Sequence, residues 1–228
     1  MSARAPIALR DHVRVPDSSR PSVGGVFLAP VPFWKRAFDI SVSSLGLVLL
    51  VPLLVAIAIA IVLESPGAPI FRQTRVGQGG RLFTIWKFRS MRLGAETLLA
   101  QLEAQNEATG HIFKIKDDPR KTRVGSFLRK TSLDELPQLW NILRGDMSCV
   151  GPRPPTTYEV AKYNENELGR LAARPGVTGL WQVTKRGDHN FEDMVDLDVA
   201  YAEHLGLLLE LSILLKTLPT VLRGKGSV

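Results

Sequence analysis

The chain has one long, mainly apolar run, followed by several shorter periodic segments. The run extends from Ile40 to Leu63 without a charged residue. It covers about 24 residues, or about 36 Å of helix, against about 30 Å of membrane hydrocarbon. Pro52 stands at its midpoint, where it removes a backbone hydrogen bond and clashes with the carbonyl of Val48. The pattern therefore predicts a membrane-embedded helix with a break at Pro52.

The charges that flank this run leave two membrane topologies open. Lys35 and Arg36 precede it, and Arg72 and Arg75 follow it. Cytoplasmic flanks carry the excess of basic residues, so a re-entrant hairpin that enters and leaves one leaflet satisfies this rule on both sides. A proline-kinked span satisfies it on one side only, yet membranes tolerate such kinks. From the residues alone, both interpretations remain open.

The shorter segments predict an α+β domain that is mostly helical. Residues 70–91 alternate around Gly77–Gly80 and predict a β-hairpin, and residues 174–183 predict a loop that feeds a strand. A short strand is expected near residues 113–120. Helical patterns predict four more segments: Ala95–Ala108, Tyr158–Arg170, Phe191–His204 and an amphipathic helix, Leu205–Leu222, broken by Pro219.

The chemistry-bearing stretch is Ser132–Arg153, in which Asp134 and Glu135 directly precede a short helix. Pro137 suits the first turn of this helix and Gly145 suits its end. The positive end of the helix dipole favours both carboxylates and phosphate oxygens. Arg129 and Lys130 lie before the acidic pair and Arg153 after it. Carboxylates held between fixed cations suit phosphoryl chemistry.

A purely structural interpretation of this stretch also fits. Ser132 with Glu135 matches an S-x-x-E capping box, and an acidic first turn is ordinary in helices. Taken by itself, the pair Asp134–Glu135 is more typical of a helix cap than of a catalytic dyad. Asp193, Asp196 and Asp198 suggest metal or ribose ligands in the same limited way, since a solvated helix face is the commoner arrangement.

Composition narrows the class of partner. The 228 residues carry a net charge of +7 and a pI of about 9.8, which favours nucleic acid, phospholipid or phosphorylated substrates. The single cysteine, Cys149, cannot form an intramolecular disulfide and is expected to be a small buried residue. Residues 1–30 are rich in Pro, Ser, Gly and Arg and predict a disordered basic tail.

Many short motifs, in one order, carry a resemblance to a known family. The chain resembles the bacterial sugar transferases, the monotopic polyprenol-phosphate phosphoglycosyltransferases, and in particular their hexose-1-phosphate branch. The resemblance covers about Lys35 to Gly226. It rests on these motifs: Lys35-Arg36 with Phe38-Asp39, Arg72-Gln73 with Arg75-Val76-Gly77, Lys87-Phe88-Arg89-Ser90-Met91, Asp118-Pro119-Arg120, Leu133-Asp134-Glu135-Leu136-Pro137-Gln138, Gly145-Asp146-Met147-Ser148, Gly151-Pro152-Arg153-Pro154, Arg174-Pro175-Gly176 with Thr178-Gly179, and Leu214-Leu215-Lys216-Thr217.

The resemblance implies specific roles for residues of this chain. Asp134 is expected to be the nucleophile and to lie at a Mg²⁺ ion, and Glu135 to complete the catalytic dyad. Arg129 and Arg153 are expected to bind phosphate, with Lys87 in a basic motif beside the site. Pro52 is expected to break a re-entrant membrane hairpin.

The resemblance also implies an activity and a location. We expect transfer of a sugar-1-phosphate, glucose or galactose, from a UDP-hexose to undecaprenyl phosphate through an aspartyl-phosphosugar, with release of UMP. The expected partners are these substrates and membrane lipids, without nucleic acid, and a homodimer is left open. The expected domains are a tail (1–30), a membrane hairpin (31–64) and a catalytic domain (65–228) on the cytoplasmic face of the bacterial inner membrane.

Two other functions fit parts of the sequence. Basic residues interleaved with aromatic ones, as in Lys87 and Arg89 beside Trp86 and Phe88, also suit a membrane-anchored binder of single-stranded nucleic acid. A half-buried strand with a basic face is the plainer interpretation. The same acidic pair would also serve a magnesium-dependent phosphohydrolase that uses water as its acceptor.

Overall fold

The computed structural model describes residues 22–23, 26–95, 97–98, 102, 106–107, 109, 115, 118–185 and 190–222. Most of the helix predicted for Ala95–Ala108 and most of the strand predicted near 113–120 lie outside these residues. So does the first part of the predicted tail. The end of that tail belongs to the fold, because Ala29 is buried and its N–H donates to the carbonyl of Ala172 at 2.8 Å.

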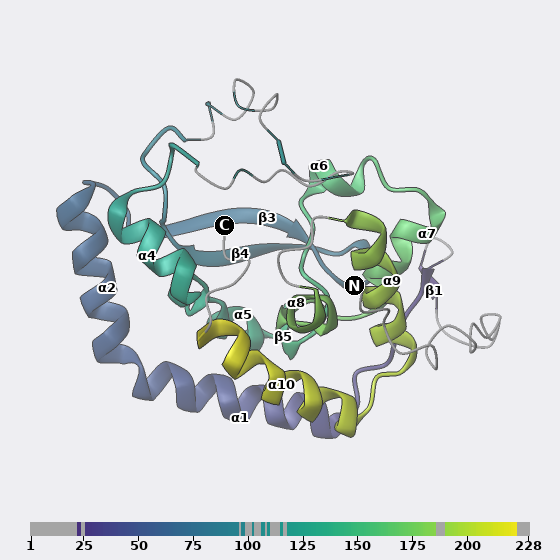
Figure 1. Ribbon diagram of the computed structural model, residues 1–228. Coiled ribbons are helices and arrows are strands. Elements are labelled where there is room, and N and C mark those ends of the chain that lie inside the picture. Colours follow the sequence, from purple (N-terminus) through teal and green to yellow (C-terminus); the bar gives the residue numbers. More distant parts are fainter. Residues whose placement is uncertain are drawn as a thin grey trace.

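Two helices joined at a sharp bend form one side of the molecule. Helix α1 (Phe33–Leu49) and helix α2 (Val51–Glu64) meet at Leu50 with a bend of 63°, and Pro52 lies in the first turn of α2 (Figure 1). The predicted break is confirmed. Among the described residues no single helix is long and apolar enough to cross a membrane, whereas this bent pair meets the requirement by length and composition.

The bent pair divides into a polar start and a largely apolar remainder. Lys35, Asp39 and Ser43 on α1 are fully buried against the rest of the chain. Large apolar side chains on α1, α2 and the last helix, α10 (Leu207–Leu222), are exposed instead. The most exposed of these are Phe33, Leu45, Val48, Leu49, Leu63, Leu208, Leu215 and Leu218. In Figure 1, α1 and α10 both run along the lower edge of the molecule.

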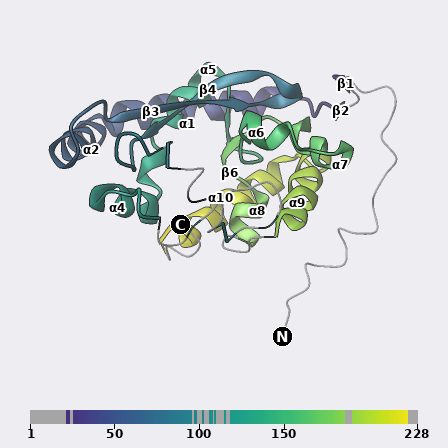
Figure 2. The ribbon, with the colours of Figure 1, turned by 90° about the horizontal axis from the view of Figure 1, so that it is seen from above.

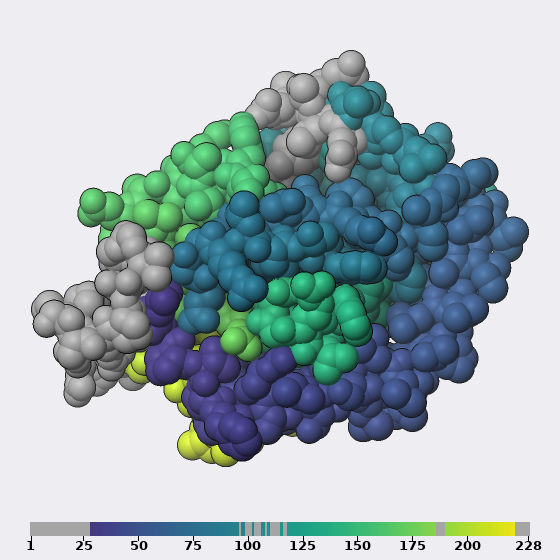
Figure 3. Space-filling view, turned by 180° about the vertical axis from the view of Figure 1, so that it is seen from behind, coloured from purple at the N-terminus to yellow at the C-terminus, as the bar shows by residue number. Residues whose placement is uncertain are grey.

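A long β-hairpin lies over the middle of the molecule, as the sequence predicted. Strand β3 (Ile70–Val76) pairs with β4 (Leu82–Phe88) in antiparallel register, with Thr74 opposite Thr84. In the view from behind (Figure 3), the hairpin crosses above α5 (Gln138–Arg144), which separates it from α1. Asn141 of α5 ties the two together, because its side chain accepts from Trp86 N and donates to Thr84 O.

The acidic stretch folds differently from the predicted cap. Helix α4 (Arg123–Thr131) ends at Ser132, which adopts a left-handed backbone with φ of 59°. A single 3₁₀ turn, Leu133–Glu135, follows, and α5 begins after Pro137. The side chain of Ser132 caps neither element, so the capping-box prediction is wrong. A residue that reverses the chain in the left-handed region is not in the extended conformation that an N-cap requires.

The segment predicted as one helix, Tyr158–Arg170, is instead three short elements. These are α6 (Thr157–Val160), α7 (Glu165–Leu168) and a 3₁₀ turn (Gly169–Ala172). Capping boxes at Thr156 and Asn164 start α6 and α7 separately. Asparagine favours such starts because its side chain bonds to nearby backbone groups.

The remaining elements complete a second side of the domain. Strand β5 (Ser148–Val150) pairs in parallel with β6 (Gly176–Thr178), and a helix rather than a further strand follows as α8 (Leu180–Thr184). Helix α9 (Phe191–Glu203) is confirmed. Helix α10 runs through Pro219 without the predicted break, and the Thr220 hydroxyl donates to Lys216 O beside it. Figure 2 shows α8, α9 and α10 grouped away from the hairpin.

Buried polar side chains tie α1 and α10 to β5. Lys35 donates to Glu210 at 2.7 Å and to the carbonyl of Val150 at 3.0 Å. Asp39 accepts from Ser148 and from Cys149 N at 3.0 and 2.9 Å. Cys149 is buried, as expected. The first turns of α1 are therefore part of the domain core.

Candidate active site

The turn that carries Asp134 and Glu135 is held in place by apolar packing. Leu133 and Leu136 pack against a buried cluster that includes Phe88 and Leu128. The turn is only three residues long, so these contacts, rather than a long helix, fix its orientation. Asp134 itself is 8% exposed. The chain therefore places a carboxylate in a nearly closed position.

Lys87 reaches the acidic pair from the hairpin. It lies on β4, and its Nζ is 2.7 Å from Oε1 of Glu135, with both side chains about a quarter exposed. The predicted basic motif is thus beside the dyad. Forty-eight residues separate the two partners, and the packing of β4 against the 3₁₀ turn brings them together.

Arg129 reaches the pair from the last turn of α4. Its Nε donates to the Ser90 hydroxyl at 2.9 Å, and its charge acts on both Asp134 and Glu135. Burial lowers the pKa of Arg129, and Asp134 offsets part of that effect. Gly125 makes the approach possible, because a Cβ there would lie 1.9 Å from Ser90 O.

The environment changes the acidity of Asp134. Burial, reinforced by the like charge of Glu135, raises its pKa to about 6, although Lys87 and Arg129 act in the opposite direction. With that pKa, about nine-tenths of the carboxyl groups are ionised at pH 7. The group is therefore a destabilised carboxylate under physiological conditions, ready to gain from a cation or from forming a bond.

A third cation, Arg75, interacts electrostatically with Glu135. Arg75 at the end of β3 donates to Pro154 O at 3.0 Å and to the Gln73 side chain at 2.7 Å. Its Nε is buried without a hydrogen-bond partner. Burial and the nearby charge of Arg153 lower the pKa of Arg75 to about 10, and Glu135 is among the carboxylates that act against this. Two guanidinium groups close together favour a bound anion.

Arg153 pairs with a carboxylate outside the acidic pair. Its guanidinium is 3.8 Å from Glu159 of α6, and its charge acts on the neighbouring Arg75. Arg170 contacts the backbone of the loop that carries Arg153. Arg170 pairs with buried Asp198 at 2.8 Å and donates weakly to the Arg153 carbonyl at 3.4 Å.

The structure brings together some of the residues that the sequence predicted for the site. Lys87 and Arg129 act on Asp134 and Glu135, whereas Arg153 pairs with Glu159 and acts on Arg75. Pro52 lies at the distant bend between α1 and α2. The three aspartates of α9 do not converge, since Asp193 pairs with Lys185 and Asp198 with Arg170. The described residues contain no cluster of three or more potential metal ligands.

Sequence reasoning missed Arg75 as a site residue. Its motif, Arg75-Val76-Gly77, was visible, but the sequence analysis treated Arg75 only as a basic residue that flanks the apolar run and belongs to the hairpin. Only the fold shows that the Nε of this arginine is buried without a hydrogen-bond partner. The one signal that the sequence offered is an arginine directly before Val76-Gly77, at the turn of the predicted hairpin.

The candidate site consists of two adjacent carboxylates amid lysine and arginine, an arrangement that suits phosphoryl chemistry. Comparison with known proteins supplies the class. The model of the family described as "Bacterial sugar transferase" matches residues 31–224. The chain belongs to the bacterial sugar transferase family.

Individual relatives agree with this assignment. The chain is 47% identical over 195 residues to a galactosyl transferase, CpsE, of Streptococcus agalactiae, covering 85% of this chain and 43% of the relative. It is 42% identical over 199 residues to the undecaprenyl-phosphate galactose phosphotransferase of Salmonella typhimurium, covering 86% and 42%. An exopolysaccharide production protein, ExoY, of Sinorhizobium fredii is 40% identical over 197 residues, covering 85% and 87%.

The relatives differ in length. The chain spans less than half the length of the first two and most of the length of the third. The shared part contains Asp134, Glu135 and every cation described above, because the family match runs from residue 31 to residue 224.

Proposed function

We propose that the chain transfers a hexose-1-phosphate from a UDP-hexose to undecaprenyl phosphate and releases UMP. The observation that carries this proposal is the buried Asp134, set between Lys87 and Arg129 with a pKa of about 6. Relatives named as galactose and glucose transferases using undecaprenyl phosphate support the substrate class. Glucose and galactose are the proposed sugars on that basis.

In the first step, a carboxylate oxygen of Asp134 attacks the β-phosphorus of the UDP-hexose. The new oxygen–phosphorus bond forms as the bond to the UMP oxygen breaks, so UMP leaves with its electron pair. An aspartate needs no base to become a nucleophile once it is ionised. Burial makes this carboxylate less stable as a free anion, which favours bond formation.

In the second step, a phosphate oxygen of undecaprenyl phosphate attacks the same phosphorus and displaces Asp134. The acyl phosphate keeps the transfer potential of the diphosphate that it replaced, so a new diphosphate forms without ATP. Glu135, held by Lys87 at 2.7 Å, lies next to the reacting carboxylate. It is placed to orient the acceptor or to share a cation with Asp134.

The cations of the site supply charge stabilisation. Catalysis of phosphoryl transfer depends mainly on positioning and on stabilising charge on the transferring and leaving oxygens. Arg129 is fixed by Ser90 next to Asp134 and is assigned to the attacked phosphate. Arg75 and Arg153, coupled to one another beyond Glu135, are assigned to the leaving phosphate.

The acidic pair also has the donor chemistry that Mg²⁺ requires. Magnesium is commonly bound by one or two carboxylates together with substrate phosphates and water. Asp134 and Glu135 are two such carboxylates. Burial and then their mutual repulsion raise the pKa of Asp134, and a divalent cation would offset this cost. Asp134 is the proposed ligand, and the bound ion would neutralise charge on the diphosphate.

The bent helix pair is proposed to lie in one leaflet as a re-entrant hairpin, with both ends on the cytoplasmic side of the bacterial inner membrane. Three observations support this location in the membrane: the 63° bend at Leu50, the exposed apolar side chains of α1, α2 and α10, and the basic residues on both flanks. Labelling of a cysteine at position 30 from the periplasm of intact cells would contradict it.

One assay separates the proposal from its rivals. Release of UMP from a UDP-hexose is measured with and without undecaprenyl phosphate. A transferase gives lipid-dependent turnover, a phosphohydrolase turns over without lipid, and a nucleic-acid binder gives none while binding RNA or DNA in a salt-dependent way. Intact-protein mass spectrometry without acceptor should show one added phosphohexose. The same mass gain in Asp134→Asn would sink the assignment of the nucleophile.

A further inference from the structure

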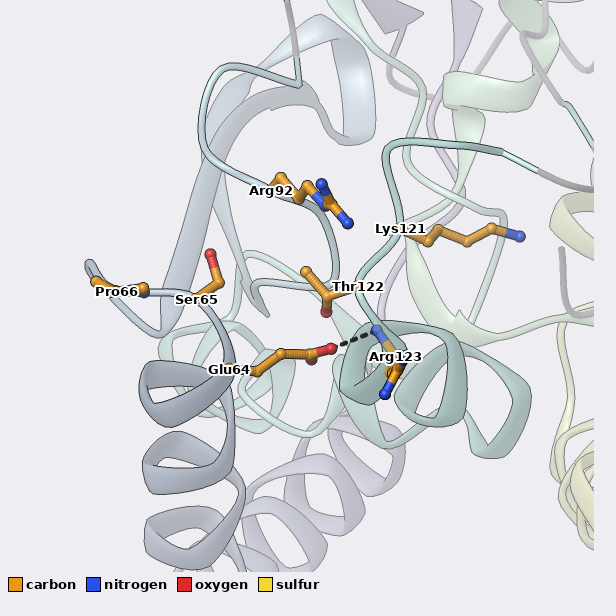
Figure 4. A pocket seen from close by; sticks show the side chains of 7 residues that line it. All are labelled: Glu64, Ser65, Pro66, Arg92, Lys121, Thr122 and Arg123. Carbon is orange, nitrogen blue, oxygen red and sulfur yellow. Dashed lines mark hydrogen bonds between the residues drawn. The ribbon is translucent and has the colours of Figure 1, made fainter.

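A polar cavity lies at the C-terminal end of α2, away from Asp134 and Glu135. Its volume is about 330 Å³, and it is lined by the end of α2, the start of α4 and Arg92 (Figure 4). The lining residues are Glu64, Ser65, Pro66, Arg92, Lys121, Thr122 and Arg123. The nine residues of α4 separate this cavity from the Asp134 turn, which is about 13 Å along the helix.

The cavity has an excess of positive charge. Arg92 and Arg123 lie on either side of Thr122, whereas Lys121 extends away from Glu64 (Figure 4). Within the described part of the chain neither guanidinium takes part in an ion pair. The one carboxylate present, Glu64, is occupied by backbone donors, with its oxygens 2.7 Å from Arg123 N and 2.8 Å from Val124 N.

The walls of the cavity are built from paired backbone rather than from a loose loop. Met91 and Lys121 form an antiparallel bridge, and Arg92 N donates to Arg120 O at 2.9 Å. Thr122 N donates to Ser90 O at 3.2 Å, and the Thr122 side chain accepts from Gly125 N. The positions of both guanidinium-bearing residues are therefore set by the fold.

Apolar side chains border the same corner. Leu63, next to Glu64, is 81% exposed, and Leu93, next to Arg92, is 67% exposed. A Cβ built on Gly67 would lie 3.1 Å from Leu93 Cδ1 and 2.9 Å from Arg89 Nη1, so this leucine packs over the turn after Pro66. Exposed leucines beside two guanidiniums, of which Arg123 also interacts electrostatically with Glu64, match an amphiphile with an anionic head.

We propose that this cavity binds the phosphate of an anionic phospholipid from the leaflet that holds the hairpin. Arg92 and Arg123 take the phosphate, and Leu63 and Leu93 face the first part of the acyl chains. This inference rests on the proposed membrane location of α1 and α2. The headgroup then fixes the point where α2 leaves the membrane and, through α4, the height of the Asp134 turn relative to the lipid phosphates.

The test measures thermal unfolding of the full chain in a neutral detergent while phosphatidylglycerol or phosphatidylcholine is titrated in. Phosphatidylglycerol should raise Tm by about 4 °C over phosphatidylcholine. In the double variant Arg92→Gln/Arg123→Gln, the apparent Kd for phosphatidylglycerol should rise about thirtyfold. Each basic residue near a lipid surface contributes about 1 kcal/mol of binding free energy, and the variant loses two of them.

A matched variant controls for net charge. Arg81→Gln/Arg144→Gln removes two exposed arginines elsewhere and should keep the wild-type response to phosphatidylglycerol. An equal loss in both variants would show a general charge effect and overturn the site. Full stabilisation by millimolar inorganic phosphate alone would show a soluble-anion site and overturn the lipid assignment. A wild-type protein that does not distinguish the two lipids would overturn the proposal directly.

The outcome is independent of turnover. Arg92 and Arg123 are outside the proposed catalytic machinery, and lipid binding is measured without UDP-hexose. Lipid discrimination with no UMP release would contradict the proposed function and leave this site standing. UMP release without lipid discrimination would do the reverse.

Discussion

Two lysine–glutamate pairs in this molecule have the same Nζ–Oε distance, 2.7 Å, and opposite surroundings. Lys35 and Glu210 join α1 to α10 with side-chain exposures of 1% and 4%. Lys87 and Glu135 join the hairpin to the acidic turn with exposures of 25% and 28%. The first pair is surrounded by protein partners, including Val150 O and the Tyr201 hydroxyl. The second borders Asp134.

This difference in burial shows that the same lysine–glutamate ion pair has different effects in the core and at the candidate site. A buried pair whose remaining hydrogen bonds are satisfied contributes little net stability but is costly to break, because one charge is left unpaired in a dry site. A partly exposed pair is worth little to stability and leaves its charges available. Lys35–Glu210 therefore fixes the arrangement of helices, and Lys87–Glu135 acts electrostatically on Asp134, the proposed nucleophile.

Removal of the nucleophile should produce the largest effect. Asp134→Asn should lower lipid-dependent UMP release by about 10⁴-fold or more, because the covalent step cannot form. Asp196→Asn, on the exposed side of α9, removes an equal charge and should leave the rate unchanged. Retention of more than about a hundredth of wild-type activity by Asp134→Asn would contradict its role.

Breaking the buried pair comes next. Lys35→Met leaves Glu210 charged and buried, so the free energy of unfolding should fall by about 3–5 kcal/mol, measured by denaturant titration in detergent. The double change Lys35→Met/Glu210→Gln removes both charges and should recover most of that loss. If the double variant is no more stable than the single one, the pair is not an isolated electrostatic unit.

The third effect concerns the stability cost of Asp134. Its folded-state pKa of about 6 exceeds the ordinary aspartate value of 3.8, so ionisation disfavours the folded state once the pH exceeds the unfolded-state value. Asp134→Asn removes this cost. At pH 8, without divalent cations, the variant should be up to about 3 kcal/mol more stable than wild type, and the difference should vanish as the pH falls from 6 to 4. A gain that is equal at pH 4 and pH 8 would contradict this cause.

The exposed pair supplies the fourth and sharpest contrast with Lys35. Lys87→Met should change the free energy of unfolding by less than about 1 kcal/mol. It should nevertheless lower the transfer rate by about 10²-fold, because a charge beside the reacting phosphate is lost. Arg81→Gln, on the same hairpin, should alter neither quantity. A large stability loss in Lys87→Met would erase the distinction between the two pairs.

The smallest effect is the pH dependence of the rate. The attacking form of Asp134 is the carboxylate, so kcat/KM should fall about tenfold between pH 7 and pH 5 and be nearly flat above pH 7. The pH profile of UMP release checks this. An unchanged rate down to pH 5 would mean that the free enzyme holds Asp134 ionised more strongly than the geometry implies.

The prediction of the fold from sequence succeeded where one strong local signal decided the outcome. Pro52 in a charge-free apolar run and the glycines at Gly77–Gly80 predicted the bend and the hairpin, and both are confirmed. It failed where short elements compete. Tyr158–Arg170 is divided by Asn164, and Ser132 reverses the chain instead of capping a helix, because the tertiary contacts of Leu133 and Leu136 select the backbone there.

The sequence likewise predicted most, but not all, of the residues that the structure brings to the candidate site. Asp134, Glu135 and their neighbour Arg129 are close in sequence, so any fold keeps them close in space. Lys87 was assigned by a motif, and the structure adds its 2.7 Å contact with Glu135. Arg75 needed the fold, because its burial and its proximity to Arg153 depend on β3 packing beside the loop at Pro154.

The two ion pairs show what the sequence determines and what only the tertiary structure decides. Sequence determined the family, the acidic pair and the proline break, because these depend on residue identity within a few positions. Only the tertiary structure decided that Lys35 meets Glu210 across 175 residues while Lys87 meets Glu135 across 48. Burial is a property of the packed chain, and it alone makes one of these equal-length ion pairs a fixed part of the core and leaves the other beside the candidate site.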